Sequence, residues 1–181
     1  MPTVILKPHP ASPASPIDRI EVELERRGEI GLRLTYRASG DLERLRMPKA
    51  TEPGRRADEL WRHTCFEAFI RPASSEGYLE LNFAASIQWA AYRFEGYRAG
   101  MAEANVEPWE LVVCREADLL KLEVDIEPGR MARPDLPAPA WLVGLSAVIE
   151  DVDGGLSYWA LAHPSAKPDF HHPDSFVLEL P

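Results

Sequence analysis

Cysteine is scarce in this sequence, which contains only Cys65 and Cys114 among its 181 residues. Two cysteines cannot supply the disulfide framework that stabilises small secreted scaffolds. Both lie inside runs of alternating residues that are typical of strands, where a reduced cysteine behaves as a small buried hydrophobic side chain. We therefore expect two reduced, buried thiols and a fold that depends on its apolar core.

Long hydrophobic runs and clustered positive charges are also missing. No window approaches the roughly 20 apolar residues that span a membrane. The N-terminus MPTVILKPHPASP lacks the basic region and apolar segment of an export signal. The formal charge of -9 argues against binding to nucleic acid or to an anionic membrane, because both are bound by clustered Lys and Arg. The sequence therefore predicts a cytoplasmic protein without nucleic-acid or membrane partners, and it leaves the oligomeric state open.

Recognised metal and catalytic motifs are absent as well. The five histidines fall in no Cys-x-x-Cys or His-Glu-x-x-His spacing, and His171 and His172 would project to opposite sides of an extended chain. Asp151 and Asp153 could contribute to a calcium loop, but an Asp-Gly pair is also an ordinary hairpin turn. We expect no bound metal, with calcium as the weak alternative. No phosphate loop or nucleophile signature is present, which favours a non-catalytic role over an enzyme.

The sequence does contain a recurring alternation of apolar and polar residues with a period of two. It predicts hairpins that pair residues 20–24 with 30–36, 111–115 with 119–126, and 141–150 with 157–162, followed by a last strand at 176–180. Residues 127–140 contain four prolines and are expected to cross on the surface. About nine or ten short strands with little helical periodicity predict an all-β antiparallel sandwich or jelly-roll-like barrel. We expect one domain over residues 1–181, with residues 1–15 as an extended N-terminal segment.

Aromatic and unexpected polar residues are concentrated between Leu60 and Tyr97. This stretch predicts three strands, over residues 65–71, 78–84 and 87–94, with one plainly apolar face. The opposite face would carry a polar and aromatic set: Trp61, Glu67, Tyr78, Glu80, Asn82 and Arg93. Carboxylates, an amide and a guanidinium beside flat rings are groups that bind the hydroxyls and C–H faces of a polyhydroxylated ring. An ordinary solvated sheet face is the alternative.

Several segments of the chain resemble one known family. They are Leu60-Trp61, TCFEAF from Thr64, YLELNF from Tyr78 and KPDFHHPDSF from Lys167. In this order they resemble the DOMON-like proteins, which are related to family 9 carbohydrate-binding modules, over roughly residues 15 to 180. The resemblance implies a β-sandwich that binds sugars or, in a cytochrome branch, haem b through Met and His.

The sugar-binding branch of that family implies particular residues. An aromatic residue precedes the strand Glu at the spacing of Trp61 and Glu67, and a later Trp completes a clamp around a terminal sugar. In this chain the later position corresponds to His163, with Trp159 nearby.

The haem branch would place its ligands elsewhere. They would be sought at Met47 or Met101 and at His163 or His171.

The favoured hypothesis is non-catalytic binding of a carbohydrate or sugar-like small molecule, without a cofactor. The candidate ligand-binding residues are Trp61, Glu67, Tyr78, Glu80, Asn82, Arg93, Trp159, His163 and His171. A haem-binding module is the alternative. The third hypothesis is a glycoside hydrolase that uses Glu67 and Glu80 as its carboxyl pair.

Overall fold

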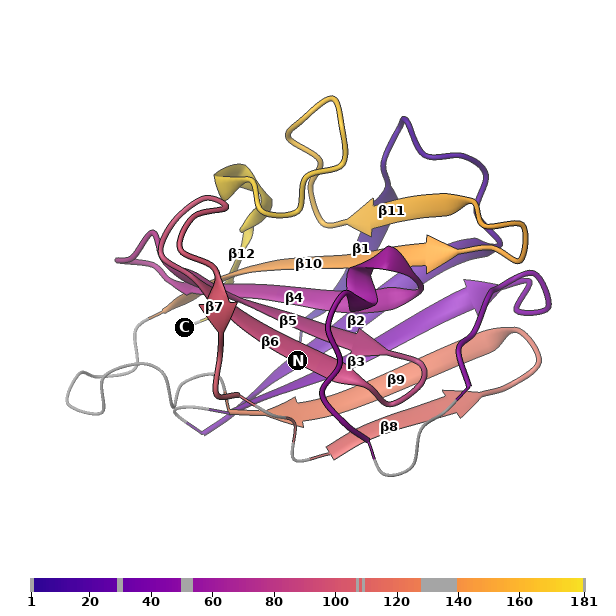
Figure 1. Cartoon of the computed structure of the whole chain (residues 1–181), viewed down its shortest axis with the longest axis horizontal. Helices are drawn as coiled ribbons and strands as arrows, with labels where there is room; N and C mark the ends of the chain where they lie inside the picture. The colour runs from indigo at the N-terminus through magenta and orange to yellow at the C-terminus, as the bar shows by residue number, and fades with distance from the viewer. Residues whose placement is uncertain are drawn as a thin grey trace.

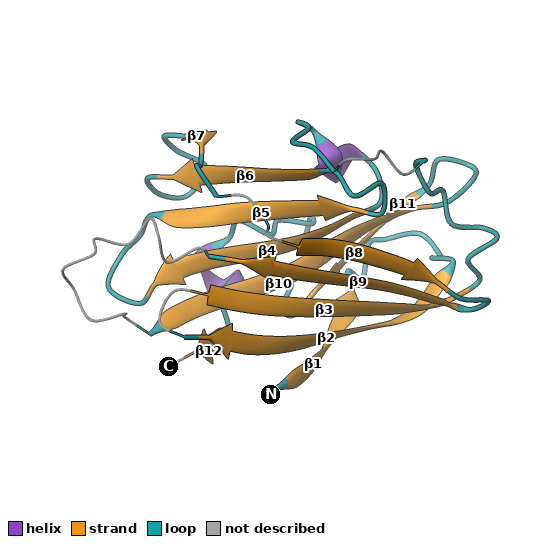
Figure 2. Ribbon diagram, turned by 90° about the horizontal axis from the view of Figure 1, so that it is seen from below, coloured by secondary structure: helices purple, strands orange, loops and turns teal. Residues whose placement is uncertain are grey.

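A computed structural model describes residues 2–28, 31–49, 54–106, 108, 110–127 and 140–180. These residues contain β-strands and short 3₁₀ turns but no α-helix. The strands are packed as two antiparallel layers, and in Figure 2 one layer lies in front of the other with the strands running across the view. The predicted all-β sandwich is confirmed.

The first sheet has the strand order β1-β2-β3-β9-β8. Its strands are β1 (Thr3–Pro8), β2 (Ile17–Arg27), β3 (Gly31–Gly40), β8 (Glu110–Arg115) and β9 (Leu119–Ile126).

The second sheet has the order β7-β6-β5-β4-β10-β11, with β12 beside β10 (Figure 1). Its strands are β4 (Cys65–Pro72), β5 (Tyr78–Ala84), β6 (Trp89–Phe94), β7 (Ala102–Glu103), β10 (Trp141–Glu150), β11 (Leu156–Ala160) and β12 (Leu178–Leu180). The 3₁₀ turns η1 (Leu60–Arg62) and η3 (Pro173–Ser175) lie outside the strands.

Strand β1 belongs to both sheets, which the sequence did not indicate. Its first half pairs with β2, through Val4 opposite Val22, and its end pairs with β11, through Lys7 opposite Ala160. Within the segment expected to be extended, residues 1–15, residues 3–8 form this paired strand. Pro8 is tolerated because it is the last residue of the strand, where a missing N–H interrupts no ladder.

The main core lies between the two sheets and follows the predicted alternation. Each contributing strand places every second side chain inward, as the pleat requires. Buried residues come from β2 (Ile20, Val22, Leu24), β3 (Leu34, Tyr36), β9 (Leu120, Leu122, Val124), β4 (Phe66, Ala68, Ile70), β5 (Leu79, Leu81, Phe83) and β10 (Val143, Leu145, Ala147). The hydroxyl of Tyr36 donates a hydrogen bond across this core to the carbonyl oxygen of Glu67, 2.8 Å away.

The second sheet is also covered on its outer face. A smaller apolar cluster there is built from Leu60, Cys65, Phe69, Tyr78, Ala84, Ala90, Tyr92, Phe94 and Phe176. Its lid comes from η1 and from the segment between β11 and β12. Gly144 of β10 permits this close approach, because an added Cβ would stand 3.0 Å from the carbonyl oxygen of Ser175. Residues on this face of β4 and β5 are therefore enclosed rather than solvated.

The structure corrects two details of the strand predictions. Ile87 has a φ of 59° and belongs to the turn before β6, so that strand begins at Trp89. Cys114 lies on β8 at the end of the first sheet, where one side is unpaired, and it is exposed rather than buried. Both cysteines are free thiols in the structure. Most of the predicted surface crossing, residues 128–139, lies outside the described residues.

The pairing of β1 can be tested with two neighbouring side chains. Leu6 is 1% exposed in the core, whereas Ile5 is 45% exposed on the opposite face. We expect Leu6→Ala to lower the free energy of unfolding by about 2 to 5 kcal/mol, because it removes buried methyl groups. Ile5→Ala should change it by less than about 1 kcal/mol. Urea denaturation of both variants measures the difference, and equal losses would contradict the assignment.

Candidate functional site

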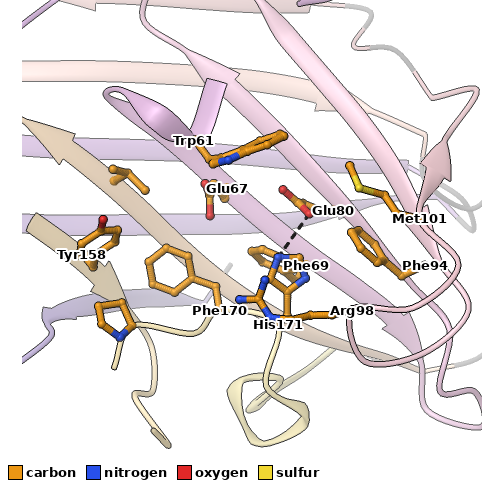
Figure 3. A pocket seen from close by; sticks show the side chains of 12 residues that line it. Trp61, Glu67, Phe69, Glu80, Phe94, Arg98, Met101, Tyr158, Phe170 and His171 are labelled. Carbon is orange, nitrogen blue, oxygen red and sulfur yellow. Dashed lines mark ion pairs between the residues drawn. The ribbon is translucent and has the colours of Figure 1, made fainter. Parts of the chain in front are cut away.

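A pocket of about 380 Å³ opens on the outer face of the second sheet (Figure 3). Its volume lies within the range of small-molecule sites, roughly 300 to 1,000 Å³. It is lined by Trp61, Glu67, Phe69, Glu80, Phe94, Arg98, Met101, Val148, Tyr158, Pro168, Phe170 and His171. The floor comes from strands β4, β5, β6, β10 and β11, and the rim comes from loops. Side chains far apart in the sequence thus meet around one space.

Glu67 lies at the floor of this pocket and is only 2% exposed. The hydroxyl of Ser146 on β10 donates a hydrogen bond to its Oε2, 3.0 Å away. Burial raises the pKa of Glu67 to about 8, and the negative charge of Glu80 adds to the rise while the Ser146 hydrogen bond opposes it. Near neutral pH the carboxyl group therefore holds its proton.

Glu80 stands on the neighbouring strand β5 and is 5% exposed. Its Oε1 accepts a hydrogen bond from Nδ2 of Asn82, 2.8 Å away. Burial raises the pKa of Glu80, and the Asn82 bond and the charge of Arg98 lower it in part. Asn82 is itself 0% exposed, and its Oδ1 has no hydrogen-bond partner among the described residues. Asn82 is the cross-strand neighbour of Glu67.

His171 closes the pocket from the loop between β11 and β12. Its Nδ1 lies 2.8 Å from the hydroxyl of Tyr78, which also accepts a hydrogen bond from the backbone N–H of Arg98. The other ring nitrogen of His171, Nε2, lies 3.7 Å from Oε2 of Glu80. Burial, followed by the nearby charge of Arg98, lowers the pKa of His171 to about 4. The ring is neutral near pH 7, so its contact with Glu80 is not a pair of opposite charges.

Two loops are joined at the rim by Asp169. Its carboxylate accepts hydrogen bonds from the hydroxyl of Tyr97 at 2.6 Å and from the guanidinium of Arg98 at 2.7 Å. Arg98 adopts a φ of 53°, which is uncommon for a residue other than glycine and often marks functional sites. The loop after β6 and the loop after β11 therefore form one edge of the pocket.

Aromatic rings make most of the remaining wall. They belong to Trp61, Phe69, Phe94, Tyr158 and Phe170. Trp61 follows the buried Leu60 in η1, and its ring meets Tyr92 edge to face with centroids 5.7 Å apart. In Figure 3, Glu67 lies below Trp61, with Phe170 and Tyr158 to one side and Phe94 and Met101 to the other.

The structure brings together part of the set proposed from the sequence. Trp61, Glu67, Glu80 and His171 line the pocket. Tyr78 holds His171 and also lines an adjoining pocket, while Asn82 lies behind Glu80.

Arg93 was placed on the same face in error. It pairs with Leu79, so it shares the core-facing side of the sheet, and it emerges exposed near the sheet edge. Tyr92 and Phe94 are the residues of β6 that face outward with Glu80 and Tyr78.

Trp159 and His163 also lie away from the pocket. Trp159 packs in the core between the sheets, where its indole N–H donates to the hydroxyl of Ser157 at 3.2 Å. His163 contacts the N-terminal segment: its Nε2 lies 2.8 Å from the carbonyl oxygen of Lys7, and its ring meets that of His9 edge to face. The neighbouring β11 residue that lines the pocket is Tyr158.

The sequence interpretation missed several lining residues. Phe69 could have been found, because it alternates in phase with Glu67 on its own strand. The same holds for Ser146, which bonds Glu67 from behind the lining and alternates in phase with Val148. Arg98 and Phe170 lie in loops, where no periodicity indicates the direction of a side chain.

Other chemistries find less support among the described residues. They contain no group of three or more His, Cys, Asp or Glu side chains that could hold a metal ion. Asp151 Oδ1 accepts hydrogen bonds from the N–H groups of Asp153 and Gly155, as expected of a hairpin turn. Burial raises the pKa of the Cys65 thiol well above its usual value, which disfavours a reactive thiolate. No helix in the described part of the chain is long and apolar enough to cross a membrane.

The fold of this chain has a counterpart among solved protein structures. No protein-family model and no curated protein sequence matches the chain. Among solved structures, the chain is similar to that of a candidate carbohydrate-binding protein from Bacteroides uniformis ATCC 8492, with a TM-score of 0.68. The match covers 98% of this chain and 84% of the other, at 12% sequence identity. The two proteins share a fold. An identity this low establishes nothing about ligand or family.

The raised pKa of Glu67 gives a pH-dependent stability. Between its ordinary value of 4.5 and about 8, the folded protein retains a proton that the unfolded chain has lost, so the free energy of unfolding falls as pH rises. The lowered pKa of His171 has the opposite effect, but only between about 4 and 6.5. The contribution of Glu67 is therefore best seen from pH 6.5 to 8.

We expect Glu67→Gln to gain stability relative to the wild type by about 1 to 2 kcal/mol across that interval, because one proton corresponds to about 1.4 kcal/mol per pH unit. Urea denaturation at several pH values measures this difference. Glu179→Gln, which changes an exposed carboxylate on β12, is the matched control. Parallel curves for wild type and Glu67→Gln would show that Glu67 does not hold a proton.

Proposed function

We propose that the protein binds a carbohydrate or a sugar-like small molecule, without catalysis, in the pocket between Trp61 and His171. The observation that carries this proposal is the wall itself: aromatic rings alternate with two enclosed carboxyl groups, Glu67 and Glu80. Rings cover the C–H faces of a sugar, while carboxyl oxygens bind its hydroxyls. A buried polar group that meets a ligand hydroxyl also discriminates against ligands that lack one.

Two further points support the proposal. The Bacteroides uniformis protein that shares this fold is described as a candidate carbohydrate-binding protein. The sequence resemblance to DOMON-like proteins and family 9 carbohydrate-binding modules points to the same ligand class. Trp61 lines the pocket with Glu67, as that resemblance implies, but the second side of the clamp differs. Phe170 and Tyr158 face the pocket in place of Trp159 and His163.

Calorimetry with a panel of monosaccharides and disaccharides tests this function. We expect at least one sugar to bind the wild type, and we expect Trp61→Ala and Glu67→Ala each to weaken it by about 5- to 150-fold. This is the factor that corresponds to 1 to 3 kcal/mol of lost packing or hydrogen bonding. Arg93→Ala is the control, because that side chain is exposed on the opposite side of the sheet.

Circular dichroism should confirm that each variant folds. Binding that is unchanged in both pocket variants would place the site elsewhere, and the absence of any sugar binding would overturn the proposal. Release of a chromogenic aglycone by the wild type would favour the hydrolase hypothesis and its Glu67 and Glu80 pair instead.

Haem binding is the second candidate because Met101 and His171 line the same pocket. The surroundings of His171 fit a haem less well than a sugar. Its Nδ1 is bound to Tyr78, and the carboxyl of Glu80 stands 3.7 Å from Nε2, where an iron would have to bind.

The visible absorption spectrum of the protein reconstituted with haem separates the two candidates. If haem is not the ligand, we expect the Soret band to be the same in the wild type and in variants that lack Met101 or His171. A band that is abolished by both Met101→Ala and His171→Ala, but not by Met47→Ala, would establish the haem site.

A further inference from the structure

The two carboxyl groups at the floor of the pocket, Glu67 and Glu80, are hydrogen-bonded to neutral side chains. Among the described residues, the side chain of Glu67 is bonded to the Ser146 hydroxyl, and that of Glu80 to the amide of Asn82. Neither interaction brings a positive charge. Arg98 is the pocket-lining cation, but its guanidinium is paired with Asp169 at the rim.

The charge of Arg98 favours the carboxylate form of Glu80 only in part, and Glu67 has no such help from a cation, so both groups are unfavourable as carboxylates. Removing an ionised carboxylate from water is expensive unless a countercharge replaces the lost hydration. Protonation of Glu67 meets this constraint, since burial and Glu80 together raise the pKa of Glu67 to about 8. A positively charged ligand group would supply the missing countercharge and would displace the proton of Glu67.

The walls of the pocket are suited to the same kind of group. Five aromatic rings line it, from Trp61, Phe69, Phe94, Tyr158 and Phe170. The face of an aromatic ring attracts a cation through its quadrupole, and the attraction is stronger where the cation is shielded from water. In Figure 3 the rings surround the two carboxyl groups on several sides, so a bound ammonium group would be close to both.

We propose that the preferred ligand is an amino sugar or a similar hydroxylated amine, whose ammonium group binds between Glu67 and Glu80 within the ring of aromatic side chains. This inference rests on the proposed function and specifies its ligand class. On binding, the Glu67 carboxyl group loses its proton to solvent and becomes the countercharge of the ammonium group. One proton is therefore released for each amine bound, and none is released when a neutral sugar binds.

Other titratable groups near Glu67 do not produce the same signal. Cys65 and Tyr36 have pKa values raised well above their usual ranges by burial, and the pKa of His171 is about 4. Arg98 stays charged throughout. Glu80, on the adjacent strand, is the remaining group that could lose a proton when the amine binds. Proton release from Glu80 would also indicate an ammonium group between the two carboxyl groups.

Calorimetry at pH 6.5 tests the inference with matched ligands. Glucosamine, glucose and N-acetylglucosamine share one ring and differ at a single position, and the galacto and manno series repeat the comparison. At this pH an amine of this kind is mostly protonated. We expect the amine of the best series to bind at least about tenfold more tightly than both neutral sugars. Titration in two buffers of different ionisation enthalpy, neither a primary amine, should show release of most of one proton.

Glu67→Gln separates charge from hydrogen bonding. The amide keeps an acceptor and a donor in the same shape but cannot become a countercharge. We expect this variant to lose both the preference for the amine and the proton release, so that it binds the amine and the neutral sugars with similar affinity. Glu179→Gln, at an exposed position of β12 outside the pocket lining, should retain both properties.

The outcomes distinguish the inference from the function on which it rests. Neutral sugars that bind as tightly as the amine, without proton release, would overturn the inference and leave carbohydrate binding in place. Cyclohexylamine and cyclohexanol serve as ligands without a sugar ring. If no sugar binds but cyclohexylamine binds with proton release, the cation site stands and the carbohydrate function fails.

Discussion

The second sheet of this sandwich is buried on both faces, and most of the site follows from that constraint. All seven residues of β5 are buried, as are the first six of β4. One face packs against the first sheet, and the other is covered by η1 and the loop before β12. Polar side chains on the covered face cannot be hydrated freely, so each needs a partner in the protein or a ligand.

The partners that the protein supplies are nearly all neutral. A serine hydroxyl serves Glu67 and a side-chain amide serves Glu80, while the neutral ring of His171 is held by Tyr78. Such groups satisfy hydrogen-bonding capacity without compensating charge. The result is an enclosed space that is polar in its donors and acceptors, apolar in its walls, and sensitive to the charge of whatever enters it. The backbone beneath Glu67 is fixed independently by the hydroxyl of Tyr36 in the other sheet.

The sequence predicted the fold well because alternation with a period of two is a property of each strand taken alone. It located the strands around Glu67 and Glu80 and assigned both to the outward face, which the pairing confirms. Arg93 was misplaced because its direction depends on where the preceding turn ends, and Ile87 in the left-handed region delays the start of β6.

Other features required knowledge of three-dimensional neighbours. Strand β1 is short and ends in proline, so its own sequence is a weak signal. Its place between the two sheets is set by pairing partners more than ten residues away in the chain. Whether the outward face of the second sheet is wet or covered is likewise decided by loops, whose positions no local pattern encodes. Arg98 and Phe170 reach the pocket through such loops, which is why the rim was harder to predict than the floor.

Asp169 gives the rim a further property. Its two carboxylate oxygens bind Tyr97 and Arg98, which belong to a loop about 70 residues earlier in the sequence. The Tyr97 ring also meets that of His172, and the N–H of Arg98 donates to the Tyr78 hydroxyl that contacts His171, so several contacts join the two loops. The ion pair is the contact among them that dissolved salt weakens, because the arginine side chain is half exposed. The rim of the pocket thus depends in part on ionic strength, whereas strand pairing sets its floor.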